Sequence, residues 1–454
     1  MDTTMDTPAS EKTLIQVEKD FIQAESALAM PVPTTFPPEP HASTPLNGRT
    51  AKHRRTDRFQ MIALCGTLFL SGWNDGSVGP LIPKIQDFYH LSYTIVSLIF
   101  VFKCTGYIIG AIGNIALTER VGFGKLLLLG AFIQIIGNSL LSAAVHVPFP
   151  IFVLGNFLTG IGLATQNAQT VAYVASFTAA PELKMGIVQS AYGAGALVSP
   201  LVATQFAQFQ GGRWCFNYLI TVGLNILNGL HLALVFEGRH QDESLARLGQ
   251  VSLEPQSGTS DGKKQSRFKQ MLRLKSVHLL AIFLFVYVGT EVTIGGWIVS
   301  YMESVRHGGA SSGYISAGFW GGLMLGRLFC LPLNKLINEI RAMYLYIGIA
   351  IGLELIIWFV PSYITSAIAV SLVGFCLGPM FPIGMTHGAR ILPPHLLVTS
   401  IAWASGISIS GAAVLPFVTG AIAGARGISS LEPFAISMLV LMGLLWTTVP
   451  RKRY

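Results

Sequence analysis

The sequence predicts an all-α membrane protein in which twelve transmembrane helices form two six-helix bundles. Hydrophobic residues make up 51% of the 454-residue chain and charged residues only 11%, whereas about 25% of the residues are charged in soluble globular domains. Apolar runs recur that are long enough to cross a hydrocarbon core of roughly 30 Å as helices. A polar segment near the middle of the chain divides these runs into six and six.

The apolar runs have no polar face, which excludes a soluble helical protein, because a helix on the surface of a soluble protein keeps polar residues on its exposed side. Lengths above the minimum indicate tilted helices rather than additional spans. The predicted spans are residues 59–83, 94–117, 125–146, 149–176, 185–207, 215–236, 277–300, 312–333, 341–360, 363–386, 396–423 and 433–450.

The segments outside the spans are polar. Residues 1–58 are predicted to be a disordered cytoplasmic tail, and residues 451–454 a short cytoplasmic tail. Residues 238–275 are predicted to be a cytoplasmic linker between one bundle at 59–237 and another at 276–450. This orientation places 24 of the 30 Lys and Arg residues on the cytoplasmic side, as the positive-inside rule requires.

Charge and cysteine content exclude several other classes. The net charge of +8 is explained by membrane insertion and contact with an anionic inner leaflet, and no nucleic-acid-binding motif accompanies it. The five cysteines form no CxxC pair, so we interpret them as packing residues rather than metal or redox sites. Because no nucleophile–base, metal or nucleotide motif is present, an enzyme is disfavoured and no cofactor is expected.

Acidic residues inside three apolar spans provide the first functional signal: Asp75, Glu291 and Glu354. A charge at membrane depth is energetically unfavourable and usually marks a pathway for an ion or solute. Asp75 and Glu291 occupy nearly the same position in the first helix of each half. This repetition is typical of a carrier built from two repeats, with its solute site between them. We interpret Glu354 as a neutral group that hydrogen-bonds to a neighbouring helix.

The turn between the second and third spans reads GNIALTERVGFGK and contains Glu119, Arg120, Gly122 and Lys125. It resembles the G-x3-D-R-x-G-R-K signature of the major facilitator superfamily, with a longer acid-to-glycine spacing and two residues between the basic positions. Within that superfamily, four stretches resemble the fungal relatives of fucose permeases and sodium-dependent glucose carriers. These stretches are residues 287–302, 319–328, 378–393 and 415–424.

The resemblance covers residues 59–450 and implies the major facilitator fold, in which two helical bundles alternate access to a central site. It implies gating roles for Glu119, Arg120 and Lys125, and Arg327 is the expected counterpart in the second half. Fucose permeases carry an acid in the fourth helix, where this chain has Thr165 or Gln166. Coupling through that position is therefore not implied.

Three charged residues are predicted to couple ion movement to transport: Glu291, Asp75 and Lys103. From the helical rise, Asp75 and Lys103 differ in depth by about 7 Å, within reach of a long lysine side chain. We expect an ion pair there, which serves either as a proton-dependent switch or as a fixed bridge. Glu291 is the best candidate for reversible protonation, because no cation is expected beside it. Arg327 is expected about 14 Å from Glu291 in depth and is assigned to cytoplasmic gating or topology.

Polar and aromatic residues, mainly on the fourth and fifth helices, are predicted to bind the solute. The fourth span places several of them on one face by the i, i+3, i+4, i+7 rule, and amides supply both hydrogen-bond donors and acceptors. The alternative for any single glutamine is a hydrogen bond between helices. The predicted solute contacts are Gln166, Gln169, Thr170, Tyr173, Gln189, Tyr192, Trp73, Asn74, Tyr287 and Trp297.

These observations favour a secondary active transporter of the plasma membrane, expected as a monomer, that moves a small polar organic solute. The solute is expected to be sugar-like or a metabolite, and the coupling ion a proton. An exporter of a fungal secondary metabolite or drug is the alternative within the same class. A transporter-like nutrient receptor is the alternative from another class, although the chain ends at RKRY rather than in a long tail. Nucleic acid is not an expected partner.

Overall fold

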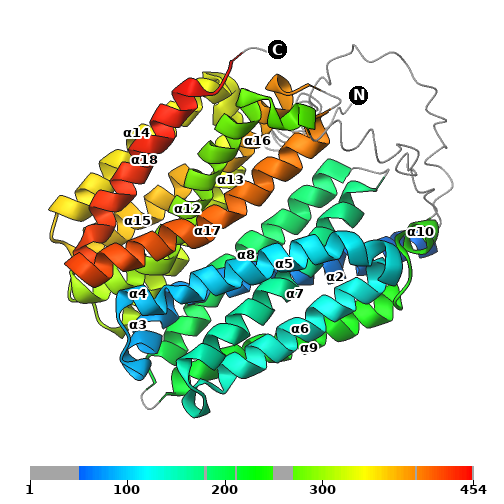
Figure 1. Ribbon diagram of the computed structural model, residues 1–454, viewed down its shortest axis with the longest axis horizontal. Helices are drawn as coiled ribbons and strands as arrows, with labels where there is room; N and C mark the ends of the chain where they lie inside the picture. The colour runs from blue at the N-terminus through cyan, green and yellow to red at the C-terminus, as the bar shows by residue number, and fades with distance from the viewer. Residues whose placement is uncertain (1–50, 178–180, 210–211, 249–268, 394–395, 452–454) are drawn as a thin grey trace, which may run out of the picture. The chain divides into compact units, whose positions relative to one another are not determined.

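The first half of the chain forms six spans in the computed structural model, which describes residues 51–177, 181–209, 212–248, 269–393 and 396–451. The first span consists of two helices, and a short helix precedes the second span (Figure 1). The helices of this half are α2 (Ala51–Gly76) and α3 (Val78–Tyr89), α4 (Tyr93–Val96) and α5 (Leu98–Val121), α6 (Phe123–Ser142), α7 (Phe149–Ala175), α8 (Pro181–Ala207) and α9 (Phe216–Phe236).

The second half repeats this arrangement, so the described residues contain all twelve predicted spans and no strand. Its helices are α12 (Lys275–Ser304), α13 (Gly313–Ile337), α14 (Glu339–Phe359), α15 (Tyr363–Leu377) and α16 (Met380–Ile391), α17 (Leu397–Arg426) and α18 (Leu431–Thr448). Short 3-10 turns are η2 (Ala144–His146), η3 (Arg213–Cys215), η4 (Ala310–Ser312) and η6 (Ile428–Ser430). By length and composition alone, ten of the described helical segments are suited to cross a membrane.

The ends of the polar segments differ from the prediction. Helix α2 begins at Ala51, so residues 51–58 are helical rather than part of the predicted disordered tail. An ion pair of 2.6 Å between Lys184 Nζ and Asp57 Oδ1 joins this extra turn to the start of α8. Residues 1–50 lie outside the described part of the chain. In the predicted linker, α10 (Gln241–Ala246) packs against the first half, and residues 249–268 are not described.

The helix of the first span and the helix of the tenth span are each interrupted where a proline follows four residues after a glycine. A proline has no N–H group, and its ring conflicts with the carbonyl four residues earlier, which interrupts a helix. Pro80 lies four residues after Gly76, where α2 ends, and Pro382 lies four residues after Gly378, which separates α15 from α16. Each half therefore contains one span that the structure divides into two helices.

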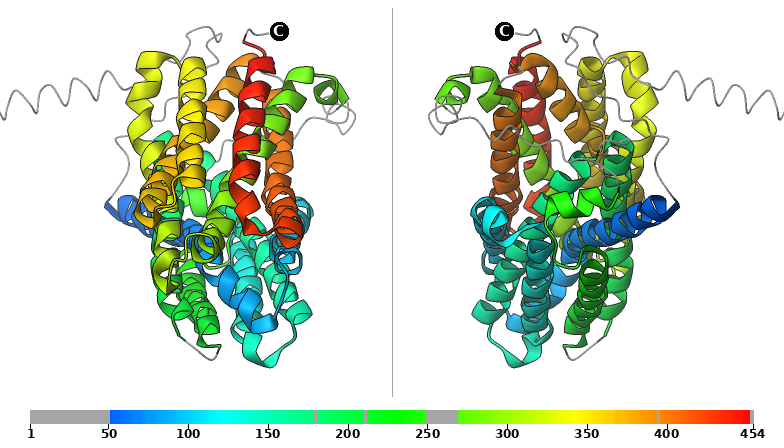
Figure 2. Two further views of the ribbon diagram at one scale, coloured as in Figure 1. Left: turned by 90° about the vertical axis from the view of Figure 1, so that its left-hand side faces the viewer. Right: turned by 90° about the vertical axis from the view of Figure 1, so that its right-hand side faces the viewer.

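The two halves pair their helices in the same way, which makes the repeat structural as well as a feature of the sequence. The first and fifth spans pack together as α2 with α8 and as α12 with α17. The second and fourth spans pack together as α5 with α7 and as α13 with α15. The helices of the two halves form separate groups in the views of Figure 2.

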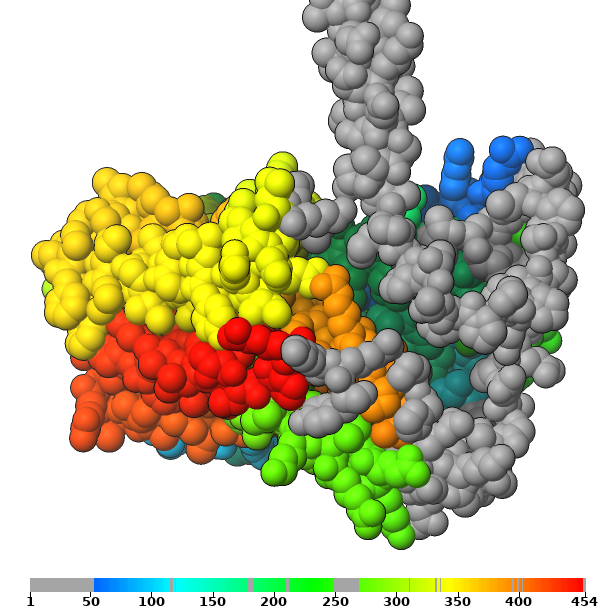
Figure 3. All heavy atoms as spheres, turned by 90° about the horizontal axis from the view of Figure 1, so that it is seen from above, coloured from blue at the N-terminus to red at the C-terminus, as the bar shows by residue number. Residues whose placement is uncertain are grey.

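The outward-facing sides of the helices are apolar. Leu234, Phe329 and Leu336 have exposed fractions of 77%, 69% and 84%, values that would be unfavourable for large apolar side chains in water. On the face that Figure 3 shows, α14 and α18 lie side by side. This surface is suited to lipid contact, as expected of an integral membrane protein.

The two halves touch each other at the end of the bundles that lies away from the start of α2. Helix α3 packs on α12, α4 on α17, and α8 on α13. Thr94 Oγ1 donates a hydrogen bond of 3.4 Å to the carbonyl oxygen of Gly420, and the Tyr93 ring packs edge-on against Trp297. Further along, Cys104 Sγ donates to the carbonyl oxygen of Ile409 at 3.3 Å. These contacts separate the interior from this end of the molecule.

Candidate functional site

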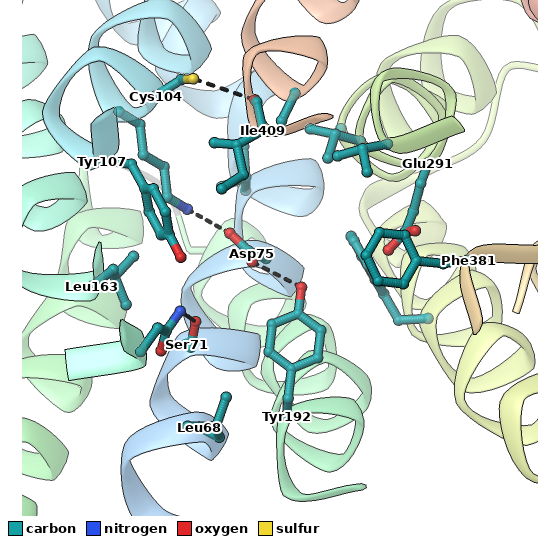
Figure 4. Close-up of a pocket in the computed structure, with 18 of the residues that line it drawn as sticks. Leu68, Ser71, Asp75, Cys104, Tyr107, Leu163, Tyr192, Glu291, Phe381 and Ile409 are labelled. Carbon is teal, nitrogen blue, oxygen red and sulfur yellow. Dashed lines mark hydrogen bonds and ion pairs between the residues drawn. The ribbon is translucent and has the colours of Figure 1, made fainter. Parts of the chain in front are cut away.

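A cavity of about 680 Å³ lies between the two halves, within the range of about 300–1,000 Å³ that is typical of small-molecule sites. One wall is formed by α2, α3, α5, α7 and α8 of the first half, and the other by α12, α13, α16 and α17 of the second half. Figure 4 shows Asp75 and Tyr192 on one side and Glu291 and Phe381 on the other. The location between the repeats is the one that the sequence predicts for a solute site.

The wall of the first half is organised around the carboxylate of Asp75. Lys103 Nζ lies 2.8 Å from Asp75 Oδ1 and also donates to the carbonyl oxygen of Asn74 at 3.3 Å. The Tyr192 hydroxyl donates to Asp75 Oδ2 at 2.9 Å. The contact between Asp75 and Lys103 that the helical rise predicts is therefore present, and Tyr192 adds a third member from α8.

A glycine contact sets the position of this group. A Cβ atom at Gly72 would overlap the backbone carbonyl oxygen of Tyr192, so only glycine allows α2 and α8 to approach so closely. Gly72 lies three residues before Asp75. The close approach of α2 to α8 at this glycine also brings the Tyr192 hydroxyl to the Asp75 carboxylate. Small residues at a helix interface thus determine the geometry of a polar contact in the cavity.

The wall of the second half contains a second ion pair, which corrects the sequence-based expectation. Arg327 Nη2 lies 3.4 Å from Glu291 Oε1, whereas the sequence analysis places no cation beside Glu291. Ending the seventh span at residue 300 accounts for about 6 Å of the expected offset of about 14 Å. Because α12 extends to Ser304 and α13 begins at Gly313, Glu291 and Arg327 are 13 and 14 residues from these ends. Both then lie at a depth of about 20 Å.

Glycines also fix the position of Arg327. Cβ atoms at Gly322 and Gly326 would overlap the backbone carbonyl oxygens of Ser371 and Phe375 on α15. The resulting close contact between α13 and α15 holds the helix that bears the guanidinium. The same device, a glycine-mediated approach of two helices of one half, therefore supports the ion pair in each wall.

The two ion pairs differ in which member faces the cavity. In the first half, the side chain of Asp75 is 35% exposed and that of Lys103 is 17% exposed. In the second half the order is reversed, with 27% for Arg327 and 9% for Glu291. The Arg327 Nε atom is also buried without a hydrogen-bond partner among the described residues. One wall therefore presents mainly an acid to the cavity, and the other mainly a base.

Four predicted solute contacts on the fourth helix lie inside the first bundle instead of lining the cavity. Gln166 bonds to Gln134 and the carbonyl of Leu127, with Gln134 Nε2 2.6 Å from Gln166 Oε1. Gln169 Nε2 donates to Asn114 Oδ1 at 2.9 Å and to Thr118 Oγ1 at 2.7 Å. The interhelical alternative therefore describes these two glutamines better. The four residues are buried and are Gln166, Gln169, Thr170 and Tyr173.

Other predicted contacts divide between cavity and core. Gln189 and Tyr192 of α8 line the cavity. Trp73 Nε1 donates to Thr221 Oγ1 at 3.0 Å, and Asn74 Nδ2 to the carbonyl oxygen of Leu70 at 2.9 Å. On α12, the Tyr287 hydroxyl donates to Leu377 O at 3.1 Å and Trp297 Nε1 to Pro416 O at 3.0 Å. These four hydrogen bonds keep the donor side chains buried between helices, outside the cavity lining. The four residues are Trp73, Asn74, Tyr287 and Trp297.

Sequence reasoning missed several cavity residues, three of which have a recognisable signal. Ser71 lies one turn before Asp75, and Tyr107 lies one turn after Lys103, so each shares a helix face with a predicted residue. Asn167 directly follows Gln166, and its Nδ2 atom donates to Ser71 Oγ at 2.9 Å. The inward face of α7 is therefore one position away from the predicted face. Trp320 and Phe381 also line the cavity, but an aromatic residue in an apolar span gives no comparable signal.

The turn between α5 and α6 lies at the far end of the first half from the contacts with the second half. Gly122 has φ of 88°, a conformation that favours glycine. The Gly124 N–H donates to the carbonyl oxygen of Arg239 at 2.9 Å, so the turn packs on the segment after α9. Arg120 and Lys125 are exposed. The side chain of Glu119 lies outside the described residues, and the gating roles stay predictions.

Comparison with known proteins places these features in a family. The sequence profile of the Major Facilitator Superfamily matches residues 64–416. The chain is 27% identical over 420 residues to Bypass of stop codon protein 6 of Saccharomyces cerevisiae, covering 87% of this chain and 83% of that protein. It is 26% identical over 410 residues to a Glucose/galactose transporter of Brucella abortus, covering 85% and 92%.

A solved structure shares the fold. The crystal structure of the E. coli fucose:proton symporter FucP matches with a TM-score of 0.60 and 17% sequence identity, covering 86% of this chain and 98% of that one. The twelve-helix arrangement expected from the sequence is confirmed by this match and by the helices themselves.

Proposed function

Because the chain belongs to the Major Facilitator Superfamily, we propose that it is a secondary active transporter that moves a small polar organic solute by alternating access, coupled to protons. The observation that supports this best is a single cavity whose two walls come from different halves, each with its own acid–base pair. A rocking motion of one half against the other would change both walls together.

The contacts between the halves suit such a motion. They consist of glycine approaches, single hydroxyl groups and aromatic edges, as between Thr94 and Gly420 or between Tyr93 and Trp297. Such contacts can form and separate without leaving a buried charge unpaired. We infer that this arrangement is the state closed to the outside, with both chain termini in the cytoplasm of a cell whose plasma membrane contains the protein as a monomer.

Proton coupling is assigned to Glu291, with Asp75 as the second candidate. Both carboxyl groups line the cavity and each is paired with a base from the next helix. A proton that binds to either carboxylate weakens its ion pair, and the base is then released to contact a solute. The proton and the solute therefore affect the same contacts, which is the requirement for coupling.

An exporter of amphipathic metabolites is the second candidate, and one observation favours it. The wall of the second half is largely apolar and includes Val288, Phe381 and Met385. A monosaccharide offers little apolar surface to such a wall, whereas a secondary metabolite with a hydrophobic ring system would bury it. The direction of transport distinguishes this candidate from an importer.

Reconstitution of the full chain into liposomes tests proton coupling. Proteoliposomes that contain a pH-sensitive dye are given D-glucose, D-galactose, L-fucose or 4-nitrophenyl glycosides, and internal pH is followed in each orientation of an imposed gradient. We expect solute-dependent proton movement that Glu291→Gln abolishes. The control is Glu303→Gln, which neutralises an acid on the same helix outside the cavity lining. Solute flux that is unaffected by the gradient and by Glu291→Gln would remove the proton role.

A further inference from the structure

The cavity has two chemically different walls. The wall of the first half contains most of the polar groups: Ser71, Asp75, Lys103, Tyr107, Asn167, Gln189 and Tyr192. The wall of the second half has Arg327 and Glu291 within an otherwise largely apolar surface. That surface includes Val288, Val292, Trp320, Phe381, Met385 and Ile409. A solute that fills this space has to offer hydrogen-bonding groups on one side and an apolar surface on the other.

Arg327 is the charged group of the apolar wall with an incompletely satisfied set of donors; the Trp320 Nε1 atom in the same wall is also buried without a partner among the described residues. The contact of Arg327 with Glu291 Oε1 is long, at 3.4 Å, and the Arg327 Nε atom is buried without a hydrogen-bond partner among the described residues. A guanidinium has five N–H donors in a planar fork that fits a carboxylate through two parallel hydrogen bonds. Arg327 is also more exposed to the cavity than Glu291, so an incoming anion meets the base first.

We propose that the solute is an amphipathic carboxylate whose acid group binds Arg327. Its apolar part packs against Phe381 and Met385, and its hydroxyl groups face Asn167 and Gln189 on the opposite wall. This assignment rests on the proposed transport function and narrows it, because it replaces a general polar solute by one chemical class. A neutral sugar would not give the Arg327 guanidinium a charged partner and would face the apolar wall with hydroxyl groups, which is unfavourable on both counts.

The same geometry links carboxylate binding to the uptake of one proton. When the carboxylate of the solute becomes the partner of Arg327, Glu291 loses its base and is neutralised by a proton. One negative charge and one proton enter together, so the net charge of the cavity does not change. The titratable side chains that face this region from the surrounding helices are Arg327 (α13), Tyr287 (α12), Asp75 (α2), Lys103, Cys104 and Tyr107 (α5), and Tyr192 (α8).

Four related compounds separate the contributions of the acid group and the apolar group. They are D-glucose, D-glucuronate, 4-nitrophenyl β-D-glucoside and 4-nitrophenyl β-D-glucuronide. Isothermal titration calorimetry on the purified full chain in detergent measures their affinities. We expect the nitrophenyl glucuronide to bind about tenfold or more tightly than the nitrophenyl glucoside, the effect of one charge-assisted contact. D-Glucuronate, which lacks the apolar group, is expected to bind about tenfold more weakly than its nitrophenyl derivative.

Variants assign these differences to residues. Arg327→Gln is expected to erase the preference for the glucuronide, and Arg327→Lys to retain part of it, because an ammonium keeps the charge but not the planar fork. Arg426→Gln, which changes an exposed arginine at the end of α17, is the matched control and is expected to preserve it. Size-exclusion chromatography verifies that each variant is folded, and the wild-type comparison does not depend on any variant.

Proton uptake is measured in the same titrations by repeating them in buffers of different ionisation enthalpy. Binding of the glucuronide to the wild type is expected to take up close to one proton, and Glu291→Gln is expected to retain the preference for the glucuronide without the proton uptake.

The inference is overturned by equal affinities for glucoside and glucuronide, by a preference that survives Arg327→Gln, or by no binding of any of the four compounds. Proton-driven flux of neutral solutes with no carboxylate preference would contradict this inference and leave the transport proposal standing. A carboxylate preference in binding without any flux in liposomes would contradict transport alone.

Discussion

The two ion pairs of the cavity are counterparts in the repeat, yet they present opposite charges to its interior. In each half the acid is on the first span and the base on the second: Asp75 with Lys103, and Glu291 with Arg327. The acid is the more exposed partner in the first half, and the base in the second. Equivalent positions on one scaffold can therefore supply two different recognition groups, depending on how deeply each side chain is buried.

The surroundings of the pairs explain why the exposure differs. In the first half, α8 brings Tyr192 beside Asp75, where its hydroxyl supports the carboxylate in a polar setting. In the second half, α17 occupies the equivalent place and contributes Ile409 and Ala412 to the lining. The fifth span therefore gives the acid of the first half a hydroxyl partner, whereas α17 lines the cavity with Ile409 and Ala412 beside the more buried Glu291.

The largest expected effect comes from breaking the glycine contacts that hold the pairs. Gly72→Leu forces the backbones of α2 and α8 apart, and Gly326→Leu does the same for α13 and α15, because each Cβ atom would overlap a carbonyl oxygen. Overpacking of this kind costs about 1–3 kcal/mol or more. Fluorescence-detected size-exclusion chromatography is expected to show a loss of most of the monodisperse protein in both variants.

Matched controls exist in both halves. Gly223 in α9 and Gly352 in α14 have no atom within 4 Å of a Cβ built on them. Gly223→Leu and Gly352→Leu are therefore expected to retain the wild-type elution profile. Normal folding of Gly72→Leu or Gly326→Leu would show that the close approach is not needed to build the walls.

An effect of intermediate size comes from removing the exposed member of each pair. Asp75→Asn leaves Lys103 without its partner, and Arg327→Gln leaves Glu291 without its partner. A buried unpaired charge is unfavourable and becomes neutral by losing or gaining a proton. In folded Asp75→Asn, Lys103 has lost a proton that it keeps in the unfolded chain, so the free energy of unfolding rises with pH. In folded Arg327→Gln, Glu291 has gained a proton that it lacks in the unfolded chain, so the free energy of unfolding falls with pH.

The slopes are expected to approach about 1.4 kcal/mol per pH unit in opposite directions. Thermal unfolding measured between pH 6 and pH 9, relative to the wild type, checks the sign. Asp87→Asn and Arg426→Gln change exposed residues and are expected to show no such slope. Slopes of the same sign in both variants would contradict the pairing of each acid with its own base.

The smallest effect is expected from Tyr192→Phe, which removes a hydroxyl that has no equivalent on α17. Loss of its 2.9 Å hydrogen bond to Asp75 is expected to reduce transport about tenfold, the lower limit for a bond to a charged group. Flux in proteoliposomes checks this. Tyr89→Phe, which loses bonds to the carbonyl oxygens of Ala144 and Val147 outside the cavity, is expected to lower stability but leave the flux near that of wild type.

Spans were predictable because bilayer thickness fixes their length. The fourth span, predicted at 149–176, is Phe149–Ala175 in the structure. The contact between Asp75 and Lys103 was also predictable, since depth along a helix follows from residue number. Glu291 and Arg327 were placed too far apart, in part because the same arithmetic began from a helix end that was four residues too early, which amounts to about 6 Å.

The rotation of a helix about its own axis was not predictable. In water an apolar face identifies the buried side, but in lipid both the outside and the interior favour apolar residues. Polar residues then mark contacts between helices as readily as a cavity. Gln166 and Gln169 bond to α6 and α5 within the first bundle, whereas their neighbour Asn167 lines the cavity.

The contact from Cys104 to the carbonyl oxygen of Ile409 has a practical consequence. It joins α5 to α17, and the Cys104 residue is 7% exposed while the halves touch there. Any cycle that separates the two helices uncovers this thiol to water, where thiolate chemistry becomes possible. The natural sequence thus contains its own reporter: the rate at which a water-soluble maleimide alkylates Cys104 follows how often the transporter changes shape.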